Sequence, residues 1–261
     1  LIPVYVDCDV NTFNMDTNKI EEAVSNKTKA IFSVPIYGNP CEMDDILSIC
    51  KRHNLMLIED CCESMGAKYK DKYVGSFGRI ASFSFYYSHH ITTLEGGICV
   101  TDDHELSEMM RIVRAHGWVR QVENKNKWIE MYKDFDPKFL FVNDGYNLRI
   151  TEPQAAMGLL QIDKIDKFID NRKSNAKKYY NELKSLGDFF SFQTTTKHSE
   201  NSHFGFPMIV KNNKYFSRDE ICTYLNNCGV ETRPIIAGNL ARQPANNLFE
   251  HRISCKLSNS D

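Results

Sequence analysis

The sequence lacks a long hydrophobic run: no stretch approaches the roughly 20 consecutive apolar residues that a helix needs to cross a bilayer. Its 9 cysteines include no Cys-x-x-Cys pair, which argues against a zinc or redox motif of that kind. The formal net charge is only -2, so the chain has no general electrostatic attraction to nucleic acid or to an anionic membrane. We therefore expect a cytoplasmic protein with reduced thiols, and neither nucleic acid nor a membrane as a partner.

The overall composition is typical of a globular protein with a large core. The chain has 261 residues, of which 42% are hydrophobic and 25% charged. We expect two parts: a large α/β cofactor-binding domain over residues 1–155, and a long linking helix with a small α+β domain over residues 156–261. Because Leu1 opens directly in a strand-like run, we also expect further sequence before Leu1, and a continuation of the small domain beyond Asp261.

The first part alternates apolar strands with amphipathic helices. Strands are predicted at 3–7, 29–36 and 55–58, and a helix at 42–53, where apolar residues recur with helical period. This order predicts parallel pairing of the three strands with right-handed crossovers. Ligands of such sheets bind beyond the carboxyl ends of the strands, which is where Asp60 lies.

A strand, a polar loop and a second strand follow between Arg79 and Thr101. The loop carries two adjacent histidines, His89 and His90, and a Gly-Gly turn precedes the second strand. Hydroxyls near the histidines, such as that of Ser84, can hold a phosphate together with loop amides. A metal site at the histidine pair is disfavoured, because neighbouring side chains on extended backbone point apart.

The rest of the chain is predicted less regularly. Residues 117–144 lose all periodicity, which is typical of a functional loop, and a long helical region spans about 154–186. Beyond it we expect a strand at 204–210, a helix opened by a capping box at Ser217, and a strand at 230–233.

Several of these segments together resemble one protein family. The chain is similar to the DegT–StrS group of sugar aminotransferases and dehydratases, which are pyridoxal-phosphate enzymes of fold type I. The resemblance covers most of the chain and rests on five segments in the right order: residues 57–67 (LIEDCCESMGA), 82–90 (SFSFYYSHH), 95–97 (EGG), 114–117 (RAHG) and 145–156 (GYNLRITEPQAA).

Position 89 departs from the pattern of the aminotransferases in this family. They carry there a lysine that binds the cofactor covalently, whereas this sequence has His89. A histidine at this place resembles the 3-dehydratase branch. The resemblance therefore implies an enzyme, a lyase that removes the C3 hydroxyl of a nucleotide-linked 4-keto-6-deoxy sugar in dideoxysugar and O-antigen biosynthesis.

The same resemblance assigns roles to individual residues. His89 is the expected catalytic acid and base, because imidazole has an ordinary pKa near about 6.5 and forms no stable covalent link to the cofactor. The expected cofactor, pyridoxal or pyridoxamine phosphate, is bound by Asp60, Glu63, Ser84 and Asn147. Asp60 holds the cofactor ring protonated. Asn147 reaches the neighbouring subunit's site, which implies a homodimer with shared active sites.

The resemblance also bears on the substrate and on the electron source. Some members of the branch hold an iron–sulfur cluster on cysteines in the segment that corresponds to 117–125, but this segment contains none. We therefore expect no cluster and no metal, glutamate as the amino donor, and GDP-4-keto-6-deoxymannose as the favoured substrate. Four residues are weaker candidates for substrate contacts: Arg120, Arg233, Asn239 and Arg242.

Three alternatives remain open at this stage. The first is an aminotransferase that uses another lysine, such as Lys68, Lys70 or Lys72. The second is a 3-dehydrase that acts on CDP-4-keto-6-deoxyglucose. The third is a catalytically inactive relative that has lost its lysine.

Overall fold

The computed structural model describes all residues from Leu1 to Asp261, and its centre is a four-stranded sheet in the order β2-β3-β6-β7. β2 pairs parallel to β3, and β3 pairs parallel to β6, whereas the edge strand β7 runs antiparallel to β6. This confirms the predicted α/β class. The four strands are β2 (Ala30–Ser33), β3 (Met56–Asp60), β6 (Ile80–Ser84) and β7 (Gly97–Val100).

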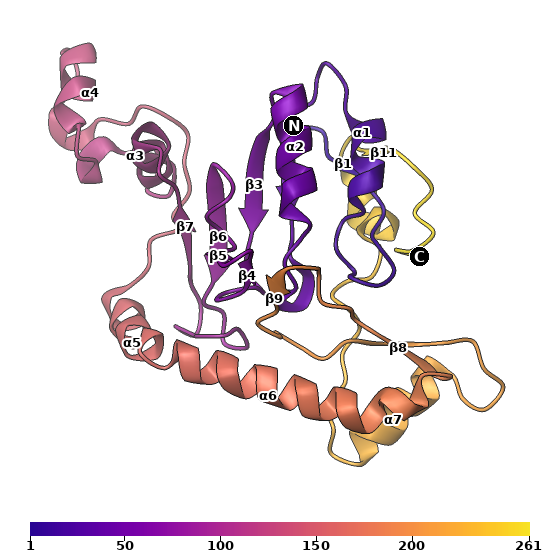
Figure 1. Cartoon of the computed structure of the whole chain (residues 1–261). Helices are drawn as coiled ribbons and strands as arrows, with labels where there is room; N and C mark the ends of the chain where they lie inside the picture. The colour runs from indigo at the N-terminus through magenta and orange to yellow at the C-terminus, as the bar shows by residue number, and fades with distance from the viewer.

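Helix α2 (Met43–His53) crosses between β2 and β3 as the sequence predicted, and it lies against the sheet in Figure 1. Its face with Met43, Ile46 and Ile49 is buried with Ile31 and Leu57 of the strands. Burying such side chains stabilises the fold by roughly 1.5–3 kcal/mol each. This cluster is the main core, and it fixes the strand ends that lead into the site.

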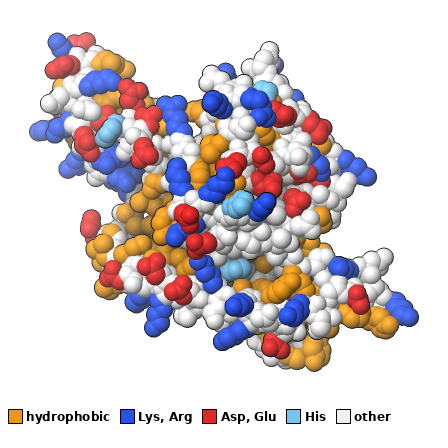
Figure 2. All heavy atoms as spheres, viewed as in Figure 1, with side chains coloured by type: hydrophobic (Ala, Val, Ile, Leu, Met, Phe, Trp, Pro, Cys, Tyr) orange, Lys and Arg blue, Asp and Glu red, His pale blue; other side chains and the backbone are white.

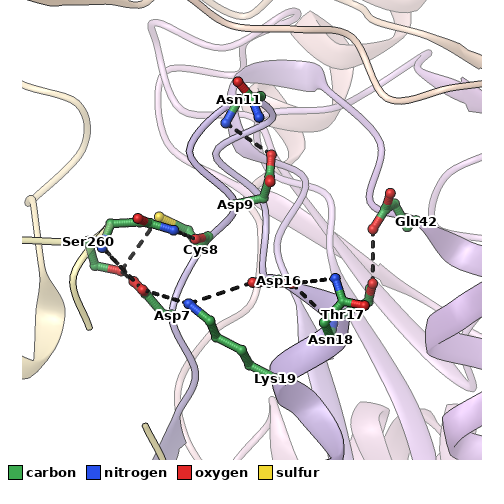
Figure 3. Close-up of polar contacts among 11 residues, drawn as sticks. Asp7, Cys8, Asp9, Asn11, Asp16, Thr17, Asn18, Lys19, Glu42 and Ser260 are labelled. Atoms are coloured by element: carbon green, nitrogen blue, oxygen red, sulfur yellow. Dashed lines mark hydrogen bonds and ion pairs between the residues drawn. The ribbon is translucent and has the colours of Figure 1, made fainter. Parts of the chain in front are cut away.

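The first predicted strand does not join this sheet. β1 (Val4–Tyr5) pairs instead with β11 (Arg252–Ile253), which comes from the other end of the chain. Figure 3 shows the polar contacts that hold these two ends together. The buried Asp7 carboxylate accepts hydrogen bonds from the Ser260 hydroxyl at 2.7 Å and from the Lys19 ammonium at 3.0 Å. This charged network holds the segment after β1 against the C-terminal end of the chain. The hydrophobic periodicity of the sequence gives no sign of it.

Beyond β7 the chain forms an extended arm and then a long helical base. Figure 1 shows α3 and α4 at one end of the molecule, and α5 and α6 running beneath the sheet toward α7. The segment 117–144, predicted to be irregular, contains the short helix α4. The helical region predicted from 154 to 186 is two helices. The bounds are α3 (His104–Val113), α4 (Lys125–Met131), α5 (Glu152–Ile162), α6 (Ile165–Leu183) and α7 (Arg218–Asn227).

The remaining elements are short. Two small sheets have the orders β5-β4-β9 and β10-β8. Their strands are β4 (Lys68–Tyr69), β5 (Lys72–Tyr73), β8 (Phe190–Phe192), β9 (Ser199–Glu200) and β10 (Met208–Val210). Single helical turns are α1 (Ile20–Ala23), η1 (Thr17–Lys19), η2 (Ile36–Gly38), η3 (Val119–Gln121), η4 (Pro137–Phe139), η5 (Lys184–Leu186), η6 (Leu240–Arg242) and η7 (Pro244–Leu248).

The strand predicted at 230–233 is wrong. The capping box of α7 at Ser217 is present, but residues 230–233 after the helix pair with no strand. The backbone N–H of Thr232 donates to the Asn226 side chain at 3.1 Å, and Pro234 has no N–H to donate. The backbone of this segment therefore forms a hydrogen bond with α7 rather than with a neighbouring strand. The strand predicted at 204–210 is confirmed only over β10.

The boundary predicted near residue 155 falls inside α5, and the pairs β1-β11 and β4-β9 join segments on either side of it. The division into two domains stays a prediction. None of the helices combines the length and the apolar character that crossing a membrane requires.

Helix α6 packs close to the turn that follows β3. Gly66 in this turn has a φ of +76°, and a Cβ atom placed there would lie 2.1 Å from Cδ1 of Ile169 on α6. A side chain at Gly66 would therefore strain the backbone of this turn and force the Ile169 side chain to move. This contact brings α6 next to the strand end that carries Asp60.

Candidate active site

Asp60 and the histidine loop lie at the same edge of the central sheet. Asp60 is the last residue of β3 and pairs in register with Ser82 of the neighbouring parallel strand β6. β6 ends two residues later at Ser84, and the loop with His89 follows. Parallel pairing thus places side chains that are far apart in sequence at one strand end, where ligands of such sheets bind.

The Asp60 carboxylate is held by neutral groups. Its Oδ1 accepts hydrogen bonds from the backbone N–H of Cys62 at 3.1 Å and from the Ser82 hydroxyl at 3.4 Å. Burial raises the pKa of the Cys62 thiol to about 12, and the Asp60 charge adds to this effect, so the thiol stays protonated beside the carboxylate. Neither donor neutralises the negative charge of Asp60, which leaves the carboxylate able to pair with a cation.

His89 is half-buried in the loop between β6 and β7. Its backbone N–H donates to the carbonyl of Tyr86 at 3.0 Å, which makes a tight turn. The centre of its ring lies 5.0 Å from that of Phe204 and 5.9 Å from that of Tyr86. The ring nitrogen Nδ1 is buried and has no hydrogen-bond partner in the chain. Nδ1 of the neighbouring His90 is also buried without a partner, so both imidazoles keep one ring nitrogen that no group of the chain occupies.

Three influences set the protonation of His89. Burial lowers the pKa of the imidazole, and the positive charge of Arg172 on α6 lowers it further, whereas the negative charge of Asp60 raises it. The net shift is downward, so the ring is neutral at neutral pH. A neutral imidazole beside a carboxylate can accept a proton, and its conjugate acid gives that proton up readily.

His90 has a different environment. Its side chain is almost fully buried, and Nε2 lies 3.3 Å from the backbone carbonyl of Ser202. Burial is the main cause that lowers its pKa to about 4. These contacts fit a packing and orienting role for His90.

Glu63 and Ser84 complete the group around Asp60. Oε2 of Glu63 accepts the backbone N–H of Tyr37 at 3.0 Å. Burial raises the pKa of Glu63, and the nearby Asp60 charge raises it as well, which shows that the two carboxyl groups are neighbours. The Ser84 oxygen accepts the backbone N–H of Tyr86 at 3.2 Å, so its own hydrogen remains available to an outside acceptor.

Arg233 approaches this group from the segment that follows α7. The Tyr87 phenol and the Glu231 carboxylate raise its pKa, and its guanidinium lies 2.8 Å from Glu231. Tyr87 belongs to the histidine loop, so Arg233 stands at the rim of the site.

The other predicted residues lie elsewhere in the single chain. Asn147 accepts hydrogen bonds from Arg149 at 3.1 and 3.2 Å on an exposed segment. Arg242 binds the Asp261 carboxylate through two hydrogen bonds of 2.9 and 2.8 Å, and Asn239 binds the same carboxylate at 2.7 Å.

Arg120 lies in the arm, 5.0 Å over the Trp118 ring. With Lys125 and Lys138 it lines a cavity of about 500 Å³ that shares no residue with the His89 group.

Sequence reasoning missed two residues of this group, Arg172 and Phe204. Arg172 belongs to a helix more than 80 positions after His89, and Phe204 precedes β10. Neither lies in a segment with a recognisable motif. Only the packing of α6 beneath the sheet brings them to the histidines.

Comparison with known proteins gives a consistent result. A family model described as the DegT/DnrJ/EryC1/StrS aminotransferase family matches residues 1–261. A GDP-4-keto-6-deoxy-D-mannose 3-dehydratase from Escherichia coli O55:H7 is 39% identical over 260 residues, which cover 98% of this chain and 66% of that protein.

Solved structures agree with the predicted fold. The E. coli GDP-4-keto-6-deoxy-D-mannose-3-dehydratase with bound hydrated PLP superposes with a TM-score of 0.90 at 38% identity, over 98% of this chain and 66% of that one. A GDP-4-keto-6-deoxymannose-3-dehydratase with a trapped PLP-glutamate geminal diamine superposes with a TM-score of 0.86 at 36% identity, over 98% and 67%. The chain thus spans about two thirds of the length of these relatives.

Proposed function

The chain belongs to the DegT/DnrJ/EryC1/StrS aminotransferase family, and on that basis we propose that it acts in a pyridoxamine-phosphate-dependent 3-dehydratase. The proposed reaction removes the C3 hydroxyl of a nucleotide-linked 4-keto-6-deoxy sugar, with GDP-4-keto-6-deoxymannose as the favoured substrate. One observation carries this proposal. An imidazole, His89, stands at the sheet edge beside Asp60, where the aminotransferases of the family have a lysine.

The residues present fit the cofactor. Asp60 offers a carboxylate that only neutral donors contact, as a protonated pyridine ring requires. Ser84 retains a hydroxyl hydrogen for a phosphate oxygen, and Glu63 lies beside Asp60. Nδ1 of His89 is buried without a partner. When bound, the cofactor would supply an amine that condenses with a sugar ketone and a ring that withdraws electrons.

His89 would move the proton in the reaction. Because its ring is neutral, it can accept a proton from a carbon atom of a molecule bound at the sheet edge. The ring then becomes an imidazolium. The imidazolium would return that proton to the C3 oxygen as the C–O bond breaks, so the leaving group departs as water. Imidazole forms no stable covalent link to the cofactor, which leaves the amine free for the sugar.

The nucleotide and the amino donor follow from the relatives. Two relatives are named as acting on a GDP-linked sugar, and one solved structure holds a PLP-glutamate adduct. We extend both features to this protein, with glutamate as the amino donor. Residues 117–125 contain no cysteine, so the proposal includes no iron–sulfur cluster. The setting would be O-antigen biosynthesis, as a Salmonella relative named for lipopolysaccharide biosynthesis suggests, and we propose the cytoplasm as its location.

The proposed partner is a second copy of the chain. Large apolar side chains are exposed on α5 and just before it: Leu148 is 68% exposed, Leu159 72% and Leu160 68%. Figure 2 shows hydrophobic side chains gathered around this end of the molecule. Such patches are typical of protein interfaces. Asn147 is exposed beside them, in agreement with the expectation that it serves the partner's site.

A product analysis tests the proposal. The purified protein would be incubated with pyridoxal phosphate, glutamate and GDP-4-keto-6-deoxymannose. A 3-dehydratase gives 2-oxoglutarate, ammonia and a sugar that has lost the C3 oxygen. Nitrogen retained on the sugar would instead show an aminotransferase, and no turnover of sugar or glutamate would show an inactive relative.

A further inference from the structure

Arg172 on α6 is bound in an unusual way for a half-buried cation. Its Nη1 donates to the backbone carbonyls of Phe204 at 2.8 Å and of His203 at 3.3 Å. Salt bridges to carboxylates hold several other arginines of this chain, such as Arg52, Arg79 and Arg242, but none holds Arg172. Its positive charge is therefore fixed in place without being neutralised.

The segment that Arg172 holds covers both histidines. The guanidinium carbon lies 6.0 Å from the centre of the Phe204 ring, and this ring lies 5.0 Å from that of His89 and 5.9 Å from that of His90. The carbonyl of Ser202, in the same segment, contacts Nε2 of His90. Phe204 thus lies against the guanidinium and against both imidazoles.

We propose that Arg172 is a positioning residue for His89, which holds Phe204 against the imidazole and keeps a permanent positive charge behind it. The role rests on the proposed acid–base function of His89. A nearby cation disfavours the imidazolium relative to the neutral ring. His89 is therefore ready to accept a proton, and once protonated it passes the proton on to the leaving oxygen more readily.

The charged and titratable groups around His89 support this assignment. Arg172 faces it from α6 and Asp60 from β3, while its loop neighbour Tyr86 and the buried His90 lie beside it. Burial and Arg172 both lower the pKa of His89, whereas Asp60 opposes them. Arg172 is thus the only one of these groups whose permanent positive charge favours the neutral ring.

The test is an NMR titration of the His89 ring in the cofactor-loaded protein without substrate, assigned by comparison with His89→Gln. In Arg172→Gln the charge is lost while a donor for the carbonyls remains. The pKa of His89 should then rise by roughly 0.5–1 unit, as expected for removal of one nearby charge. Arg172→Lys should retain the wild-type value. The control is Lys177→Gln, which removes a charge from an exposed position of the same helix and should leave the pKa unchanged.

The acid limb of the pH profile of kcat/KM should move upward with the ring pKa in Arg172→Gln and return in Arg172→Lys. A folded Arg172→Gln protein with the wild-type His89 pKa would overturn the proposal, as would an equal shift in Arg172→Lys. If the glutamine variant does not fold, Arg172→Met removes the charge and the donor together, and a wild-type His89 pKa in that variant would likewise overturn the proposal. The ring titration needs no turnover, so it can fail or succeed independently of the dehydratase assignment.

Discussion

Ser82 and Asp60 lie opposite each other on β6 and β3, and the Ser82 hydroxyl donates to the Asp60 carboxylate at 3.4 Å. The register of a parallel strand pair therefore fixes the carboxylate at the end of the sheet. Strand β6 also leads into the loop with His89, so the two groups of the proposed chemistry lie at the same edge of the sheet, with only Asp60 on a strand. Sites built on strands are held more precisely than sites on loops alone.

The Asp60 charge should be indispensable. In Asp60→Asn the side chain keeps its size but cannot stabilise a protonated ring, so kcat/KM should fall at least about 100-fold, in the range seen when a key electrostatic group is removed. Ser82→Ala, which removes one neutral donor, should reduce kcat/KM only about 3-fold, which corresponds to roughly 0.6 kcal/mol. Steady-state assays of 2-oxoglutarate and sugar release give both values. An Asp60→Asn enzyme with more than a tenth of wild-type activity would contradict the assignment.

Two inactive variants should complement each other if the active sites are shared between subunits. Asn147→Ala and His89→Asn are each expected to be inactive. A mixed dimer carries one site in which both residues are intact, so an equal mixture that is unfolded and refolded should regain about a quarter of wild-type activity. Light scattering would confirm the dimer. If both residues act within one chain, the mixture will stay inactive.

Protonation of His90 should destabilise the protein in a defined pH window. The pKa of this buried side chain is about 4 in the folded state and about 6.5 in the unfolded chain, so the unfolded state binds more protons between these values. The free energy of unfolding should therefore decrease as the pH falls from 6.5 to 4, by up to about 3 kcal/mol, and level off below that.

Urea unfolding between pH 4 and pH 7 measures this effect. His90→Asn should flatten the dependence in that window, while the exposed control His104→Asn should not. A wild-type slope that persists in His90→Asn would assign the effect to other groups, of which His89 is the first to examine, because its pKa is also lowered.

Asp7 should contribute stability at a lower pH than His90. Burial tends to raise its pKa, but hydrogen bonds from Ser260, Asn259 and Lys19 outweigh burial and lower the pKa to about 2. Because the folded pKa lies below the unfolded value of about 3.9, the stabilisation is complete above that value and is lost as the pH falls toward 2.

Asp7→Asn should lower the free energy of unfolding by about 2–4 kcal/mol at pH 7, since it removes the negative charge and replaces the oxygen that accepts from Lys19 and from the Asn259 backbone N–H with an amide nitrogen that can only donate. The difference from wild type should shrink as the pH falls from 4 to 2. Asp16, which is less buried than Asp7 and also lies near Lys19 at 3.6 Å, serves as a control through Asp16→Asn, with an expected change below about 1 kcal/mol. Equal effects of the two substitutions would contradict the assigned importance of the buried network.

The sequence allowed the local parts of this site to be predicted. Asp60 follows an apolar strand, and His89 lies in a loop between two strands, so pattern and parallel pairing sufficed to bring them together. Arg172 and Phe204 were beyond such reasoning, because their contacts depend on how α6 packs under the sheet. The pairing of β1 with β11 could not be predicted for the same reason, since it joins segments about 250 residues apart, near opposite ends of the chain.

The central claim, that His89 replaces a covalent lysine anchor, is tested most directly by intact-mass and peptide mass spectrometry after borohydride reduction with pyridoxal phosphate. We predict no covalently bound cofactor on an active-site lysine of the wild-type protein, and one cofactor on residue 89 of His89→Lys, together with loss of dehydration. Stoichiometric labelling of the wild-type protein on Lys68, Lys70 or Lys72 would contradict the account and would favour an aminotransferase.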